Sequence, residues 1–290
     1  MNQNSINVKV NSNEVNAGIE TYTITKTASG FEISFASAYA MANSGKSVAV
    51  TYSAVLNNNA GINFDANTNT AKLTYTNNPD GSTREVSDRT YTYTFGIDAK
   101  LNGSSNETWN KITQELIKGE MVKETVQGGT EEVFKPLAGA TFTLTNKDTS
   151  KVYTATSAAN GALTFTGLDA GTYTLVETAA PQGYTVNTAQ IPVVISATYN
   201  DDGTLKSYSV TVDNKATSTY EATYTGETIV NRTITSIVEG TGNASTQIKN
   251  TKITNLPSTG GIGTAIFTIG GCLIMIFAAG IFLTGRKKVE

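Results

Sequence analysis

Two residue types that carry much enzyme chemistry are almost absent from this chain. Its 290 residues include no histidine, which excludes histidine-based catalytic triads and histidine metal sites. The single cysteine, Cys272, lies in an apolar run, so neither an intrachain disulfide nor a cysteine cluster can form. We therefore expect no catalytic residue, no metal site and no cofactor in these residues.

Charge and proline are also scarce. Charged residues make up 16% of the chain, against about 25% in ordinary soluble domains. The net charge of −3 supplies no positive field for nucleic acid, and five prolines are too few for a proline-rich stalk. Threonine is abundant and there are 13 tyrosines, and both residue types favour strands. This composition, with 39% hydrophobic residues, favours an all-β protein with ordered cores.

Alternating apolar segments separated by turn residues predict tandem β-sandwich domains of the immunoglobulin-like type. The turns are marked by Asn78-Pro79-Asp80-Gly81, Asn160-Gly161 and Asp202-Gly203. Strand spacing of about ten residues is typical of two packed sheets. We expect one domain over residues 1–90 and a second over 91–254. The threonine-rich stretch 217–245 fits either strands or a stalk. The expected strands are 19–26, 48–56, 71–77, 91–99, 140–144, 151–155, 163–165, 172–177, 191–198, 207–212 and 246–253.

One short helix is expected, over residues 105–119. Trp109, Ile112, Leu116 and Ile117 recur at helical spacing, and Gly119 would end the helix. The alternative is an ordered surface insertion.

The C-terminal stretch, 255–290, combines three features. Leu256-Pro257-Ser258-Thr259-Gly260 precedes a run from 262 to 284 that is nearly all apolar or small, and Arg286, Lys287 and Lys288 follow. A helix over that run would be roughly 34 Å long, enough to cross a bilayer. The basic cluster should stay cytoplasmic, which places the preceding domains outside the cell.

This arrangement resembles the LPxTG cell-wall sorting signal of Gram-positive surface proteins. The resemblance implies that a sortase cleaves between Thr259 and Gly260 and passes Thr259 to the amine of a peptidoglycan precursor. The helix would hold the protein in the membrane only until sorting. The N-terminus, from Met1, shows no basic or apolar signal-peptide region. Because a sorted protein must be exported, we expect a fragment or a start inside a longer gene.

Two further segments carry a family resemblance. Residues 135–144 (KPLAGATFTL) and 171–184 (GTYTLVETAAPQGY) resemble the SpaA-like, B-type Cna domain of Gram-positive pilins, over about 91–254. Residues 20–95 resemble a fimbrial isopeptide-forming domain that lacks its first strands. The resemblance implies an intramolecular isopeptide bond in each domain, in which a lysine amine attacks an asparagine amide and ammonia leaves. A buried lysine loses its proton more easily, and a nearby carboxylic acid can donate to the amide oxygen.

Strand parity selects candidates for these roles. Tyr173, Leu175 and Glu177 share one strand face, so Glu177 should point inward. It matches the acid of the family motif, and a solvent-facing strand end is the alternative. Asn250 shares a face with Ile248 on the last strand and is the expected acceptor, with Asn214 as the runner-up.

The lysine assignment is less direct. Lys100 lies on the first strand, where the family has its nucleophile, but it is one residue out of phase with Ile97 and Ala99. A β-bulge before Lys100 would restore the phase, and otherwise Lys100 is a solvated residue and the bond is absent. In the first domain Asn77 is the acceptor candidate, with turn formation as its alternative.

These features lead to a wall-anchored pilin or fimbrial subunit with a structural and adhesive role. The expected partners are a sortase, a peptidoglycan precursor, other pilin subunits and an unidentified host matrix or cell-surface ligand, but no nucleic acid. One alternative is a monomeric wall-anchored adhesin that is never polymerised. Another is a wall-anchored enzyme whose catalytic domain lies upstream. A pilin-motif lysine would distinguish the first two, and none is visible.

Overall fold

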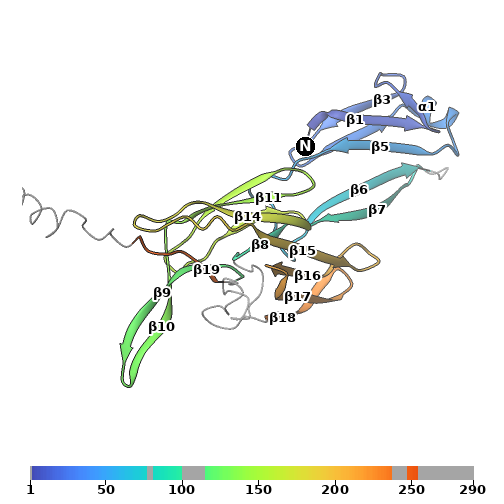
Figure 1. The fold of residues 1–290 in the computed structure, drawn as a ribbon. Coiled ribbons are helices and arrows are strands. Elements are labelled where there is room, and N and C mark those ends of the chain that lie inside the picture. Colours follow the sequence, from blue (N-terminus) through green and yellow to red (C-terminus); the bar gives the residue numbers. More distant parts are fainter. Residues whose placement is uncertain (1, 77–80, 100–114, 237–246, 254–290) are drawn as a thin grey trace, which may run out of the picture. The chain divides into compact units, whose positions relative to one another are not determined.

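A computed structural model of the chain describes residues 2–76, 81–99, 115–236 and 247–253 (Figure 1). The chain divides into two compact units, Met1–Gly61 and Ile62–Glu290. The predicted domain boundary near residue 90 stays a prediction about where independent folding begins. The boundary between the two compact units, at Gly61 and Ile62, lies before the predicted domain boundary, because Phe64 and Tyr93 pack into the core of the second unit.

The first unit is built from short strands and one short helix. Its main sheet has the order β2-β1-β5, and β3 pairs with β4 in a separate hairpin. The buried apolar side chains among its described residues are Val8, Val10 and Tyr22. The elements are β1 (Asn2–Val10), β2 (Asn13–Val15), β3 (Tyr22–Lys26), β4 (Phe31–Phe35), α1 (Ser37–Ala42) and β5 (Val48–Ser53).

The second unit contains the larger sheet and most of the buried apolar residues. A seven-stranded sheet has the order β12-β11-β14-β15-β16-β17-β18, and a three-stranded sheet has the order β10-β9-β19. Two more pairs, β8 with β13 and β6 with β7, complete it. Its strands are β6 (Asn67–Thr76), β7 (Thr83–Thr92), β8 (Phe95–Ile97), β9 (Ile117–Val126), β10 (Gly129–Pro136), β11 (Thr141–Asn146), β12 (Val152–Thr156), β13 (Phe165–Leu168), β14 (Gly171–Ala179), β15 (Ile191–Tyr199), β16 (Leu205–Val212), β17 (Lys215–Thr225), β18 (Thr228–Ser236) and β19 (Gln247–Lys249).

One pairing in the second unit joins segments far apart in the sequence. β19 lies parallel to β9, with Ile248 opposite Lys118 and Lys249 opposite Gly119 (Figure 1). From Gly119 to Val126 the β9 strand also pairs antiparallel with β10. Because parallel strands need a long crossover, this contact depends on the folding of nearly everything between them.

The all-β prediction is confirmed, since the described residues form strands and one short helix, α1. The helix expected over residues 105–119 is wrong at its C-terminal end, where Ile117 begins a strand that is held by pairing on both sides. The rest of that expectation, residues 105–114, lies outside the described residues. The stretch 217–236 consists of strands rather than a stalk, because β17 extends the large sheet and β18 pairs with it.

The single strand expected over residues 91–99 is divided between the end of β7 and β8. Residues 93–99 are buried on both faces, so the simple inward and outward alternation fails there. The residues described by the structure include no helix long and apolar enough to cross a membrane. The expected span, 262–284, lies outside them.

Candidate cross-linking site

Glu177 lies on β14, in the seven-stranded sheet. Tyr173, Leu175 and Glu177 are all buried on one face, as strand parity predicted. Glu177 pairs in register with Phe142 of β11, and β14 is flanked by strands on both sides. This central position takes the carboxyl group out of water, so it needs polar partners inside the protein.

Lys118 brings a second charged group to the same place. It lies on β9, its side chain is fully buried, and its Nζ atom is 3.4 Å from Glu177 Oε2. The Lys118 amide donates to the Gly161 carbonyl at 2.8 Å. Gly161 has φ of +79°, and a Cβ atom there would lie 2.4 Å from the Lys118 carbonyl oxygen. The Asn160-Gly161 turn therefore allows a close backbone approach that fixes the strand carrying Lys118.

Asn250 completes the group from the end of β19. Its backbone amide donates to the Gly119 carbonyl at 3.0 Å, which continues the pairing of β19 with β9. Its side-chain Nδ2 donates to Glu177 Oε1 at 3.1 Å and also to the Thr185 carbonyl. The amide oxygen, Oδ1, is buried and accepts no hydrogen bond from the part of the chain that is described. Glu177 thus contacts both the amine and the amide.

The segment after β14 closes the site. Asn187 donates its backbone N–H to Glu177 Oε2 at 2.8 Å, and its side chain donates to the Lys249 carbonyl. A turn at Pro181, closed by the Tyr184 amide, reverses the chain so that Thr185 and Asn187 run beside β19. The segment from Glu177 to Asn187 therefore supplies the acid, the turn and the backbone that covers the site.

The electrostatics of this site favour a reactive amine. Burial lowers the pKa of Lys118, and the nearby Glu177 carboxylate only partly opposes that effect. The Nζ atom also lies 5.7 Å from the centroid of the Phe142 ring. A neutral amine and a carboxylic acid result if Lys118 passes one proton to Glu177. Nucleophilic attack on an amide requires that protonation state.

The structure brings together two of the residues that the sequence selected and one that it missed. Glu177 and Asn250 meet as expected, whereas Asn214, the runner-up acceptor, is exposed in a turn with φ of +59°. Lys118 was missed because Ile117 and Leu116 also fit a helical pattern. The local sequence carries no signal for Lys118, because the strand that pairs with it, β19, is distant in sequence.

The remaining predicted site residues lie outside the described residues. These are the proposed nucleophile Lys100, the first-domain acceptor Asn77, and the sorting motif Leu256, Pro257, Ser258, Thr259 and Gly260. No group of three histidine, cysteine, aspartate or glutamate residues that could hold a metal ion occurs among the residues with described positions.

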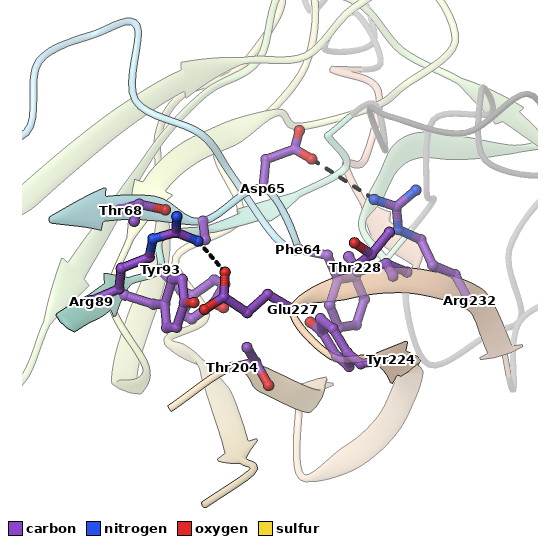
Figure 2. A pocket seen from close by; sticks show the side chains of 13 residues that line it. Phe64, Asp65, Thr68, Arg89, Tyr93, Thr204, Tyr224, Glu227, Thr228 and Arg232 are labelled. Carbon is purple, nitrogen blue, oxygen red and sulfur yellow. Dashed lines mark hydrogen bonds and ion pairs between the residues drawn. The ribbon is translucent and has the colours of Figure 1, made fainter. Parts of the chain in front are cut away.

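A separate pocket of about 580 Å³ lies within the second unit (Figure 2). Ion pairs flank it: Arg89 with Glu227, and Arg232 with Asp65 at 3.9 Å. Burial raises the pKa of Asp65, against the effect of Arg232. Because the two positive and two negative side chains pair with one another, the pocket has no excess charge to select an ion, and its polar groups tie the β6–β7 hairpin to β17 and β18.

Two family models match the chain. The prealbumin-like fold domain of the SpaA type matches residues 130–215, and the LPXTG cell-wall anchor motif matches residues 248–290. The first match contains Glu177 and the second begins at Ile248, on the strand that carries Asn250 to the site.

A curated relative and a solved structure extend the similarity. The chain is 29% identical over 272 residues to the trypsin-resistant surface T6 protein of Streptococcus pyogenes serotype M6, covering 82% of this chain and 48% of that protein. The T6 backbone pilin of serotype M6 S. pyogenes has a similar fold, with a TM-score of 0.54 and 21% identity over 87% of this chain and 58% of that structure. The chain is thus homologous to a backbone pilin, and it spans about half the length of that curated relative.

Proposed function

We propose that this chain belongs to a cell-wall-anchored pilus subunit, a sortase substrate with a structural role, whose SpaA-type domain is locked by an isopeptide bond between Lys118 and Asn250. Homology to a backbone pilin and the anchor motif support the first part. The observation that carries the second is the buried group of Lys118, Glu177 and Asn250 at the junction of β9 and β19.

The reaction at this site balances without a cofactor. Lys118 transfers a proton to Glu177, and the neutral Nζ attacks Cγ of Asn250. As the tetrahedral intermediate forms, negative charge develops on Oδ1, the buried atom that lacks a hydrogen-bond partner among the described atoms. Protonated Glu177 gives its proton to the departing Nδ2, and the carboxylate that remains takes up the proton that Nζ loses as it becomes an amide nitrogen. The C–Nδ2 bond breaks, ammonia leaves, and a secondary amide joins the two strands.

The location of the bond suits a protein that bears tension. In sequence β9 precedes and β19 follows the strands β10 to β18, and in space β9 and β19 lie side by side. A covalent link between them stops the intervening strands from being extended when the chain is pulled. It also resists proteases that act on opened chains, because the opened state is constrained.

Intact-mass measurement tests the bond. The wild-type chain should be lighter than its sequence by the mass of one ammonia, and a proteolytic digest should contain a peptide joined at Lys118 and Asn250. Asn250→Ala, Lys118→Met and Glu177→Ala should each restore the full mass. Asn214→Gly and Lys100→Met are the matched controls and should keep the ammonia loss. Full mass in the wild type, or loss of the bond in Lys100→Met alone, would contradict the assignment.

Sorting is tested at the anchor motif. Thr259→Ala, or deletion of residues 256–260, should leave the protein in the membrane fraction, whereas the wild type should be bound covalently to peptidoglycan. Variants that still attach to the wall would rule out cleavage after Thr259. A matched Ser258→Ala change tests a position that the LPxTG pattern leaves variable, and it should sort normally.

Polymerisation is a separate question with its own readout. A ladder of covalent polymers from the wall fraction supports a pilus subunit, and a single wall-linked species supports the monomeric adhesin.

A further inference from the structure

A pair of buried acidic residues, separate from Glu177, contacts the segment that leads into the strand of Lys118. Asp98 follows β8 and Glu115 precedes β9, and both are almost completely buried. The Asp98 amide donates to Glu115 Oε2 at 2.8 Å, and Tyr220 of β17 donates its hydroxyl to Glu115 Oε1. These acids contribute no atom to the proposed cross-link, so their burial needs another explanation.

The Asp98 carboxyl group joins two backbone segments. Its Oδ1 accepts the Leu116 amide at 3.0 Å and its Oδ2 accepts the Leu163 amide at 2.7 Å. Just beyond these residues Ile117 bridges Ala162, and the Lys118 amide donates to Gly161. The carboxyl group therefore takes the place of a peptide group at the end of a short ladder, and it fixes residues 116–118 against 161–163.

The backbone of Asp98 shows that this arrangement is maintained against strain. Its φ is +49°, a left-handed conformation that few residues other than glycine adopt. The Thr164 hydroxyl also donates to the Asp98 carbonyl at 3.0 Å. Hydrogen bonds to both carboxyl oxygens, the amide and the carbonyl of Asp98 offset the cost of this conformation.

The two carboxyl groups also contact each other. Burial, followed by the neighbouring Glu115 carboxylate and a hydrogen bond to it, holds the pKa of Asp98 well above its usual range. A hydrogen bond between two carboxyl groups needs one proton between them. Among the residues that the structure describes, the other titratable groups that face the pair are Tyr208 on β16 and Tyr220 on β17, and burial and Glu115 raise the pKa of both. Lys118, on β9, directs its amine to Glu177 instead.

We propose that Asp98 and Glu115 form a proton-sharing clamp that sets the register of β9 and so positions Lys118 for its reaction with Asn250. This inference rests on the proposed cross-link. Lys118 is two residues beyond the clamped Leu116, so its side chain leaves the strand on a face that the clamp determines. A displacement of about 1 Å in a reacting group can slow a reaction roughly a hundredfold.

The sign of the pH dependence follows from the raised pKa of Asp98. A raised native-state pKa means that the native pair binds more protons than the unfolded chain. Its contribution to stability is therefore fully present at acidic pH and is lost as pH rises toward the native pKa. Above that pKa two adjacent carboxylates repel, and the clamp loosens.

The test follows cross-linking as it happens. The full chain is made in a cell-free reaction, moved to buffers across a range of pH, and sampled for ammonia loss by intact mass. Asp98→Ala, which removes both acceptors, should cross-link roughly tenfold to a hundredfold more slowly than wild type. Glu115→Gln removes one charge but keeps polar atoms for Asp98 and Tyr220, so it should still cross-link. The ratio of the wild-type rate to the Glu115→Gln rate should fall as pH rises, because the cross-linking chemistry of Lys118 and Asn250 is common to both and cancels in the ratio.

A core variant separates positioning from loss of stability. Leu144→Ala removes a buried apolar side chain that lies outside the clamp. If Leu144→Ala slows the reaction as much as Asp98→Ala at equal loss of stability, the clamp has no positioning role. A constant rate ratio across pH, or an Asp98→Ala variant that reacts at the wild-type rate, would also overturn the inference. No ammonia loss in the wild type would instead overturn the proposed bond itself, and the positioning role with it.

Discussion

The two units contain strands of similar length but differ in what those strands bury. In Met1–Gly61 every residue of β5 is exposed, and the described side chains provide a small core around Val8, Val10 and Tyr22. In the second unit one continuous cluster includes Leu144, Tyr173 and Tyr208, with strands from several sheets around it. Alternating sequence produces strands in both, but the stability of a unit depends on the apolar area that a second layer covers.

Amide exchange should show the largest difference between the units. In the full chain, amides of β14 and β16 should exchange roughly a thousandfold or more slowly than those of β5, because opening them requires disruption of the large core. Mass spectrometry of peptides after timed deuterium labelling measures both in one sample. Equal protection of β5 and β14 would show that the first unit has a covering layer of its own.

Loss of the cross-link should be the next largest effect, and it should appear in the second unit alone. A bond from Lys118 to Asn250 closes a loop of roughly 130 residues, which by analogy with a disulfide stabilises by up to about 5 kcal/mol. Asn250→Ala should therefore lower the denaturation midpoint of the second unit and leave exchange in β1–β5 unchanged. Asn214→Gly, at an exposed turn, is the matched control. A midpoint that stays the same in Asn250→Ala would contradict a stabilising bond.

Truncation of one apolar side chain in each unit should give a smaller difference in the free energy of unfolding. Leu144→Ala, which removes a completely buried side chain, should cost about 2–5 kcal/mol, whereas Val50→Ala should cost less than about 0.5 kcal/mol. Val50 is 40% exposed on β5. Chemical denaturation in a Glu177→Ala background measures both, since that background lacks the proposed bond. A large effect at Val50 would point to a partner surface over β5.

Local sequence was sufficient for part of the site and insufficient for the rest. The parity of Tyr173, Leu175 and Glu177 was readable because β14 is regular and central. Asn250 was readable because it alternates with Ile248. Lys118 was not readable, since its burial comes from the parallel pairing with β19, and no local pattern encodes a partner so distant in sequence.

The Asp98–Glu115 clamp could not be predicted from the sequence for a related reason. Periodicity assigned the inward face of the strand near residue 97 to Ile97 and Ala99, which would leave Asp98 facing solvent. The chain is instead buried on both sides there, and the left-handed conformation of Asp98 breaks the alternation. Sequence patterns therefore predicted regular single strands such as β14 and β16, missed β7, and failed where tertiary contacts override the strand period.

The smallest expected effect comes from the surface ion pair of Lys72 and Glu85. Its N···O distance is shorter than that of the buried pair of Lys118 and Glu177. Lys72 Nζ lies 3.0 Å from Glu85 Oε1, closer than Lys118 to Glu177, but both surface side chains are more than half exposed. Water screens the surface charges, so a double-mutant cycle with Lys72→Met and Glu85→Gln should give a coupling energy of about 0.2–1 kcal/mol that shrinks at high salt. The buried pair cannot be screened, so Lys118→Met should destabilise the second unit by several times as much, through the unpaired Glu177 carboxylate and the missing bond. Denaturant titrations of the single and double variants measure both. A coupling above about 2 kcal/mol at the surface would mean that distance, rather than burial, decides the strength of ion pairs in this protein.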